Sequence, residues 1–187
     1  LRRRFFSRRP SPGWVKVLWG AGFFDSPPSP VTNKLGTYLP SWDAQDYLVA
    51  VAKEVPEFVR KHVQQLKAEA VYHRRALEAL IELPTAECDA VMPVVLSWFT
   101  DLPRATTLCW QAVPLMERFI KESRIDLAIQ LFEKVTQPWL RAEAATMDKW
   151  SRYLFAIELP SALLRNKSER KIFYDLAKVA SRSHIFH

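Results

Sequence analysis

Residues 91–120 read VMPVVLSWFTDLPRATTLCWQAVPLMERFI, and this stretch decides the fold class. After Pro103, apolar side chains recur every three or four residues, which is the spacing that places them on one face of an α-helix. Before Asp101, apolar residues cover most of the helical circumference, so a helix over 86–99 should be buried. Strict alternation of polar and apolar residues, the mark of a strand, is absent. The predicted stripe of the second helix consists of Leu108, Ala112, Leu115 and Phe119.

The same pattern extends through residues 41–187, which contain no glycine. Because glycine supplies the positive φ angles that tight hairpins need, paired strands are not expected there. Ser41 is the predicted N-cap of the first helix, and Ser123 with Asp126 resembles a capping box. The short turns force neighbouring helices to run antiparallel. The predicted helices cover residues 41–55, 56–69, 70–83, 86–99, 104–122, 124–136, 138–158 and a last stretch from about 168.

Residues 1–40 have a different composition. They hold all four glycines and six of the 13 prolines, so an irregular segment is expected. They also hold seven Lys or Arg against Asp25 alone, a net charge of +6, whereas residues 41–187 have a net charge of only +1. The sequence therefore predicts two parts. Residues 1–40 are a basic, aromatic, Pro/Gly-rich arm or cap, and residues 41–187 are an all-α domain.

Three segments of the helical part share a pattern of apolar residues around a proline: Val55-Pro56-Glu57-Phe58-Val59, Met92-Pro93-Val94-Val95 and Val113-Pro114-Leu115-Met116. Over about residues 44–182 the chain resembles HEAT or armadillo repeats. That resemblance implies antiparallel helix pairs stacked as a short α-solenoid, with a role in recognition and assembly rather than catalysis. The Trp-rich N-terminal stretch and the helices after it are also similar to helical regions of large bacterial signalling and defence proteins. An irregular helical bundle is the alternative architecture.

The sequence shows no spacing typical of a catalytic, cofactor or metal site. His62 and His73 fall on predicted helices as rim residues, and the carboxylates near Pro84 are separated by a helix break. Neither a metal site nor a general acid/base pair is therefore predicted. Cys88 and Cys109 are interpreted as two free buried thiols in a reducing compartment, and a disulfide between them is the alternative. We expect no cofactor and no enzymatic activity.

The first nine residues carry five arginines and two phenylalanines. Such an arm can neutralise phosphates while its rings stack on bases or enter a membrane surface. The alternative is that it docks on protein, either on the chain's own helices or on a neighbouring chain. Since residues 41–187 are nearly neutral, no basic groove continues from the arm, which favours protein. The predicted partner-binding residues are Arg2, Arg3, Arg4, Phe5, Phe6, Arg8, Arg9, Trp14 and Trp19.

The aromatic residues between Gly13 and Phe24 have two interpretations. Tryptophans on a loop-rich segment can anchor a partner, because buried Trp often dominates interface energy. The favoured interpretation is a cap that presses these rings onto the first helices, since terminal repeats need capping. The prolines at 27, 28 and 30 also permit a polyproline-type ligand.

A second basic cluster lies within the helical part, at Arg60, Lys61, His73, Arg74 and Arg75. Its residues fall on two consecutive predicted helices that should run antiparallel, so they are expected to share one polar face. We interpret this face as solvated, and an acidic partner is the functional alternative.

These observations predict a non-catalytic protein–protein interaction or scaffold module. A nucleic-acid-associated protein that uses the N-terminal arm is one alternative. Another is a helical accessory domain of an enzyme whose active site lies outside this segment. Because no run of about 18 uncharged apolar residues occurs and Lys16 interrupts any signal-like stretch, a cytoplasmic location is expected. An organellar transit peptide at the N-terminus is the alternative. The chain begins at Leu1, and we expect it to be part of a larger protein or complex.

Overall fold

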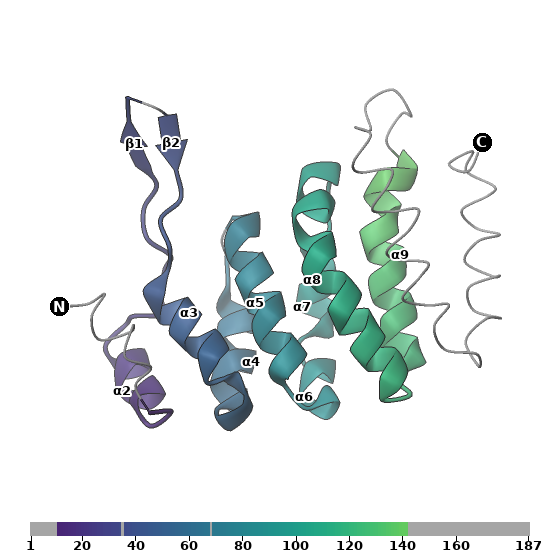
Figure 1. Cartoon of the computed structure of the whole chain (residues 1–187), viewed down its shortest axis with the longest axis horizontal. Coiled ribbons are helices and arrows are strands. Elements are labelled where there is room, and N and C mark those ends of the chain that lie inside the picture. The colour runs from purple at the N-terminus through teal and green to yellow at the C-terminus, as the bar shows by residue number, and fades with distance from the viewer. Residues whose placement is uncertain (1–10, 35, 68, 142–187) are drawn as a thin grey trace. The chain divides into compact units, whose positions relative to one another are not determined.

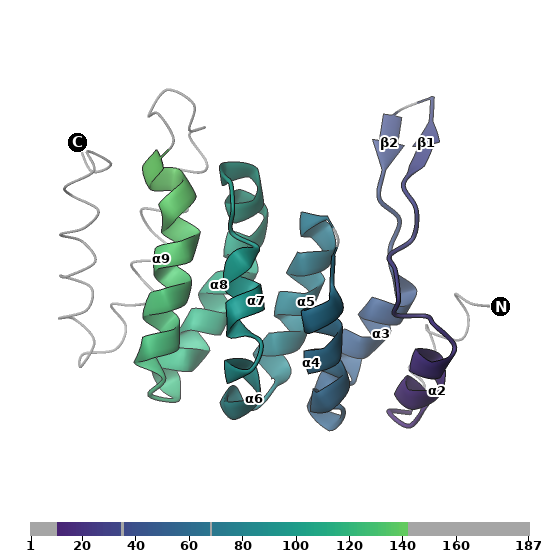
Figure 2. The same ribbon diagram turned by 180° about the vertical axis from the view of Figure 1, so that it is seen from behind.

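The computed structural model describes residues 11–34, 36–67 and 69–141. The chain divides into two compact units, and the boundary between them lies between Val94 and Val95 in the sequence. Figures 1 and 2 show the elements from opposite sides. In chain order they are α2 (Trp14–Gly20), β1 (Val31–Asn33), β2 (Gly36–Tyr38), α3 (Asp43–Ala50), the 3-10 turn η1 (Ala52–Glu54), α4 (Pro56–Gln65), α5 (Ala70–Glu82), α6 (Thr85–Asp89), α7 (Met92–Ser97), α8 (Leu102–Lys121) and α9 (Ile125–Arg141).

Helix dominates the described chain, as the sequence predicts (Figure 1). Residues 41–67 and 69–141 contain no strand, which agrees with the lack of glycine there. None of the helices in the described ranges is long and apolar enough to cross a lipid bilayer. The predominantly α-helical class is therefore confirmed.

The N-terminal segment is more regular than its composition suggests. Besides α2 it forms an antiparallel hairpin in the register Val31↔Tyr38, Thr32↔Thr37 and Asn33↔Gly36. The hydroxyl groups of Thr32 and Thr37 lie 2.9 Å apart across the two strands. Gly36 has a φ of +127°, a conformation that glycine adopts at little cost. The prediction of an irregular segment is wrong for these residues, because the glycine expected to break structure permits the turn.

The first helix of the predicted helical domain starts without its predicted cap. Trp42 occupies the N-cap position of α3, while the Ser41 hydroxyl donates a 2.7 Å hydrogen bond to the Asp46 carboxylate. Asp43 and Asp46 lie in the first turn, where the helix dipole favours negative charge. The helix ends at Ala50, short of the predicted end at residue 55, and η1 follows it.

Helix α5 is the centre of the first unit. Helices α3 and α4 and the turn η1 all contact it. Pro56 opens α4 in its first turn, as the sequence predicts, because the missing N–H has no helical partner at that position. The buried residues of α5 recur at helical spacing: Tyr72, His73, Ala76, Leu77, Ala79 and Leu80. The core of this unit is therefore built around one broad face of α5.

The predicted helix over 86–99 is two short helices, α6 and α7. Pro93 explains the break, because it lacks the N–H that a continuous helix would donate to the Asp89 carbonyl, and its ring would clash there. In the first turn of α7 the same proline is tolerated. The burial predicted for this stretch is confirmed, with at most 4% exposure for Val91, Val95, Trp98 and Phe99.

Helices α8 and α9 form the helix pair of the second unit. The Asp101 carboxylate caps α8 by accepting a 2.9 Å hydrogen bond from the backbone N–H of Arg104. Only three residues connect the two helices, so they run antiparallel. Their buried residues include the predicted stripe of α8: Ala105, Leu108, Ala112, Leu115 and Phe119 in α8, and Leu127, Ala128, Leu131 and Val135 in α9.

Ser123 closes α8 instead of opening α9, so the predicted capping box is wrong. Its φ is +60°, whereas an N-cap residue has an extended conformation. The backbone N–H of Arg124 donates to the Phe119 carbonyl at 2.7 Å, and that of Ser123 donates to the Ile120 carbonyl at 3.1 Å. These two bonds form a Schellman motif in which Ser123 takes the place usually held by glycine.

Helix α9 continues through Pro138, where the sequence predicts a new helix. The proline removes one backbone hydrogen bond, but the apolar face of the helix stays buried through Leu131, Val135 and Pro138 itself. The remainder of the predicted helix 138–158, beyond Arg141, and the predicted helix from residue 168 lie outside the described residues.

Two tryptophans provide a matched test of the packing. Trp98 is 4% exposed and Trp110 is 55% exposed. Trp98→Ala should lower the free energy of unfolding by about 3–5 kcal/mol, because it empties a large buried site. Trp110→Ala should change it by about 0.5 kcal/mol or less. Chemical denaturation of both variants measures the difference, and equal losses would contradict the burial of Trp98.

The Schellman turn predicts a stabilising substitution. Ser123→Gly should raise the free energy of unfolding by about 0.5–1 kcal/mol, because glycine removes the cost of a left-handed conformation. Ser123→Val should lower it, since a branched side chain fits this conformation poorly. Thermal melting of both variants tests the sign of each change. A stabilising valine or a destabilising glycine would show that residue 123 is not left-handed.

Candidate interaction surface

Helix α2 has one buried face and one exposed face. Val15 is fully buried and Leu18 is 7% exposed, whereas Trp14 is 46% exposed and Val17 is 57% exposed. Each pair is three residues apart, the spacing of neighbours on a helix surface. The helix therefore presents an apolar side chain pair outward while a second pair enters the core.

The turn after α2 directs the chain back onto the helices. Gly22 has a φ of +74°, and the backbone N–H of Phe23 donates to the Leu18 carbonyl at 3.1 Å. A Cβ atom on Gly22 would lie 2.8 Å from an Asp25 carboxylate oxygen. Glycine is therefore favoured by both conformation and space. The residue that follows this turn, Phe24, is only 4% exposed.

Aromatic rings seal the N-terminal segment against α3 and α4. Trp19 stacks on Phe24 at 5.1 Å between ring centroids and contacts Phe58 of α4 at 5.5 Å. Phe24 meets the ring of His62 edge-on at 5.9 Å. The Trp42 indole N–H donates a 3.0 Å hydrogen bond to the Phe23 carbonyl. These contacts press the aromatic rings of the segment onto the first helices.

Two tyrosine hydroxyls bind the two ends of the N-terminal segment to the helices. Tyr47 of α3 donates to the Ser11 carbonyl at 2.7 Å, and Tyr72 of α5 donates to the Pro40 carbonyl at 3.0 Å. Burial raises the pKa of both phenols, with a smaller contribution from Glu54 to the pKa of Tyr47. Both hydroxyls therefore stay protonated at neutral pH and act as donors.

A buried polar cluster lies beneath the rings. The Gln45 amide Nε2 donates to the Tyr72 carbonyl at 2.9 Å and lies 3.0 Å from His62 Nε2. Only the amide nitrogen of Gln45 can donate to a carbonyl, so the Gln45 atom that faces the imidazole is this same nitrogen. The Nε2 atom of His62 therefore accepts a hydrogen bond from it. His62 is therefore neutral, with its proton on Nδ1. Burial lowers the pKa of His62 to about 4, in agreement with this arrangement.

Exposed large apolar side chains concentrate in the N-terminal segment. Among the described residues six such side chains are exposed, and five of them lie between residues 14 and 39. Trp14 and Val17, the helix patch, lie on α2, whereas Val31, Tyr38 and Leu39, the hairpin patch, lie on and just after the two strands. Figures 1 and 2 show the hairpin extending away from the helices of its unit. The sixth side chain is Trp110 of α8.

The structure separates the predicted partner-binding residues. Trp14 is exposed in the helix patch, while Trp19 packs against Phe24 and Phe58. The other seven, Arg2, Arg3, Arg4, Phe5, Phe6, Arg8 and Arg9, lie outside the described residues. Sequence reasoning missed Val17 and the hairpin patch. The available signal was the pair of β-prone stretches Val31-Thr32 and Thr37-Tyr38 before and after Gly36, and the high proline and glycine content masked it.

Several residues of the basic cluster in the helical part are ion-paired or buried. Arg60 pairs with Glu87 at 3.0 Å, and Arg75 pairs with Asp46 at 2.7 Å and also with Glu78. The expectation that His62 and His73 are rim residues is wrong, because they are 3% and 4% exposed. Intramolecular carboxylates thus already neutralise two of the three arginines.

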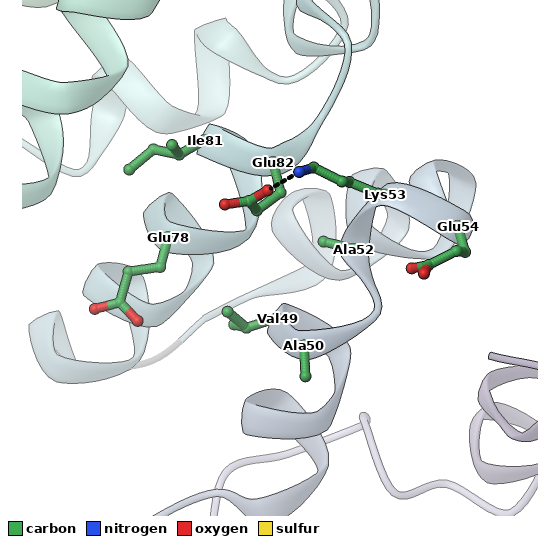
Figure 3. A pocket seen from close by; sticks show the side chains of 8 residues that line it. All are labelled: Val49, Ala50, Ala52, Lys53, Glu54, Glu78, Ile81 and Glu82. Atoms are coloured by element: carbon green, nitrogen blue, oxygen red, sulfur yellow. Dashed lines mark ion pairs between the residues drawn. The ribbon is translucent and has the colours of Figure 1, made fainter. Parts of the chain in front are cut away.

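One open pocket of about 500 Å³ lies between the α3–η1 region and α5. Figure 3 shows Val49, Ala50 and Ala52 on one side and Glu78, Ile81 and Glu82 on the other. The Lys53 ammonium group joins the two sides through a 2.8 Å ion pair with Glu82. Glu54 completes the lining, so carboxylates outnumber ammonium groups three to one.

The cysteines match their predicted state. Cys88 and Cys109 are both free and buried. Burial raises the pKa of Cys109 to about 11, so its reactive thiolate form is scarce at neutral pH. Among the described residues, no group of three or more His, Cys, Asp or Glu side chains has an arrangement that could hold a metal ion.

The buried histidine predicts a pH dependence of stability. Because the folded-state pKa of about 4 lies below the unfolded value of about 6.5, the unfolded chain takes up a proton first as the pH falls. Stability is therefore lost between about pH 6.5 and 4, by about 3 kcal/mol. His62→Gln, which keeps an acceptor for Gln45, should flatten this part of the profile. Parallel profiles for the two proteins would exclude His62 as the cause.

Comparisons of this chain with protein-family models, with characterised proteins and with solved structures found no match. Helical architectures of this kind carry many unrelated functions, so the fold alone assigns none. Function must therefore be inferred from the residues that the molecule exposes and from those that it buries.

Proposed function

We propose that this chain is a non-catalytic protein–protein interaction module of a larger protein or complex, and that it binds through its N-terminal segment. The observation that carries the proposal is the concentration of exposed large apolar side chains in that segment, five of the six among the described residues. Tryptophan and tyrosine are the residues most often found as energetic anchors of interfaces. Trp14 and Tyr38 are the two anchors that we assign.

The hairpin supports a protein partner in a second way. Its two strands have three residues each, and all six residues are exposed. An isolated two-stranded hairpin is only marginally stable in water, and its open edges can pair with a further strand. A partner that covers Val31 and Tyr38 or extends the sheet would supply the missing stabilisation.

Two features support the proposed architecture of stacked antiparallel helix pairs, a short α-solenoid of the HEAT or armadillo type. In the first unit α3 packs on α5, two helices further along the chain, and in the second unit α8 pairs with α9. The rings of Trp19, Phe24 and Trp42 would serve as the cap that a terminal repeat requires. The two free, buried cysteines favour the cytoplasm as the proposed location.

The pocket between α3 and α5 supports a non-catalytic assignment. Two of its three carboxylates are held in ion pairs, Glu82 with Lys53 and Glu78 with Arg75. General acid/base catalysis needs a carboxyl group that is tuned and open to a substrate. The pocket is instead wide and solvent-exposed, since the Lys53 and Glu82 side chains are 72% and 43% exposed.

Photo-crosslinking tests the proposed anchors. A benzophenone amino acid would replace Trp14, Tyr38 or Trp110, one at a time, in the full chain within extract of the source organism. Trp110 is the control because its side chain is 55% exposed but lies on α8. We expect a discrete protein adduct from position 14 or 38 and none from position 110. The adduct would be identified by mass spectrometry and then purified as a binding partner.

With the purified partner, Trp14→Ala or Tyr38→Ala should weaken binding by about tenfold or more, the effect of losing an interface anchor. Trp110→Ala should leave the dissociation constant unchanged. Adducts of equal yield from all three positions, or unchanged binding by both N-terminal variants, would refute the proposed surface.

A further inference from the structure

The two edges of the β1–β2 hairpin differ in the hydrogen bonds that they can offer. Asn33 and Gly36 flank a loop of two residues, so they form the hydrogen-bonded pair that closes the turn. Such pairs alternate with non-hydrogen-bonded ones along an antiparallel ladder, so Thr32 and Thr37 form a non-hydrogen-bonded pair. Their hydroxyl groups lie only 2.9 Å apart, in agreement with the close approach of side chains in such pairs. The backbone N–H and C=O groups of both threonines therefore point to the outer edges of the hairpin.

Proline blocks the outer edge of β1. Two residues before Thr32 the next outward position is Pro30, which has no N–H to donate. On β2 the outward positions are Thr37 and Leu39, and each has both an N–H and a C=O. Leu39 precedes Pro40, which favours the extended backbone that continues a strand. The outer edge of β2 is therefore the edge that can accept a further strand.

This edge is complementary to itself when a second copy of the chain runs antiparallel to it. With Thr37 of one chain opposite Leu39 of the other, these two residues exchange two backbone hydrogen bonds, and the symmetric pair exchanges two more. Tyr38 then lies opposite the same tyrosine of the second copy, where cross-strand side chains interact. Tyr38 is 52% exposed in the single chain, so the pairing covers aromatic surface that one chain leaves in water.

The same register also brings opposite charges together. When the two strands are centred on Tyr38, residue 34 of one chain is level with residue 42 of the other. The exposed Lys34 at the hairpin tip then lies near Asp43, in the first turn of α3. Val31 pairs with Tyr38 on one face of the hairpin, so the four strands would share one apolar face.

We propose that the outer edge of β2 pairs with β2 of a second copy of this chain, antiparallel and centred on Tyr38, to form a four-stranded sheet. The occupant is a second copy because one segment supplies every donor and acceptor that the pairing needs, and because Lys34 and Asp43 carry opposite charges at matching positions. The contact is two-fold symmetric, and Pro30 blocks the outer edges that remain, so association stops at the dimer. The proposal rests on the interaction function proposed above and names the partner of the hairpin patch.

A matched pair of proline variants tests which edge pairs. Thr37→Pro removes the outward N–H of β2, Thr32→Pro removes that of β1, and both lose the same hydroxyl contact. Sedimentation equilibrium of the purified chain should show a weak monomer–dimer equilibrium. Thr37→Pro should raise its dissociation constant about tenfold or more, because each dimer loses two hydrogen bonds. Thr32→Pro should change it by about twofold or less. A parent chain that stays monomeric up to about 1 mM, or a larger effect of Thr32→Pro, would overturn the pairing.

Cysteine crosslinking tests the register in a chain that keeps every backbone N–H. The Cα atoms of a non-hydrogen-bonded pair are about 4.5 Å apart, a distance that a disulfide spans. Tyr38→Cys should therefore give disulfide-linked dimers under copper-catalysed air oxidation. Val31→Cys is the control, because Val31 is 39% exposed but would lie three strand spacings, about 14 Å, from its copy. The native cysteines are both buried. Equal dimer yields from positions 31 and 38, or none from position 38, would refute the register.

The pairing and the proposed function can fail separately. Photo-crosslinking at position 14 tests whether another protein binds, whereas sedimentation and cysteine crosslinking use the purified chain alone. A monomeric chain that still gives a protein adduct from position 14 would overturn only the pairing. A dimer linked through position 38 whose position 14 gives no adduct would support the pairing and refute Trp14 as an anchor.

Discussion

The closure of aromatic rings over a buried amide is the interaction on which the first unit depends. Gln45 is only 1% exposed, and its amide nitrogen donates to the Tyr72 carbonyl while facing His62. In a buried site the hydrogen bonds of such a cluster are strengthened by the low local dielectric, and each donor needs an acceptor. Phe24 and Trp42 supply that cover by meeting the His62 ring edge-on. The N-terminal segment is thus part of the core.

This closure also determines what the segment can offer to a partner. Val15, Leu18 and Phe24 of this segment are buried in the core. Trp14, Val17 and the hairpin patch of the same segment remain exposed to solvent. The inner rings fix the position of α2, and a fixed scaffold presents exposed anchors at a smaller entropic cost on binding. The cap and the proposed anchor interpretations of the aromatic residues are therefore compatible, because they call on different residues of one segment.

Sequence patterns correctly predicted the features of the fold that depend on local chemistry and on the spacing of apolar residues. The helical class, the first-turn position of Pro56 and the burial of Trp98 all follow from such patterns. The failures occur where backbone conformation depends on tertiary context. Ser123 adopts a left-handed conformation without glycine, Pro93 divides a helix, and Pro138 does not. At the candidate site, helical periodicity alone does not tell which side of α2 is covered. The sequence therefore predicts partner binding for both Trp14 and Trp19, although the structure places them in different environments.

Hydrogen exchange of the amides in α3 and α4 tests most directly whether the N-terminal segment belongs to the core. Two double variants are compared. Trp19→Ala combined with Phe24→Ala removes two inner rings, and Trp14→Ala combined with Val17→Ala removes the helix patch. Loss of the inner rings should lower the free energy of opening of both helices by about 3 kcal/mol or more, because each ring fills a packed site. Loss of the helix patch should leave protection nearly unchanged. Equal protection of α3 and α4 in the two double variants would contradict the account.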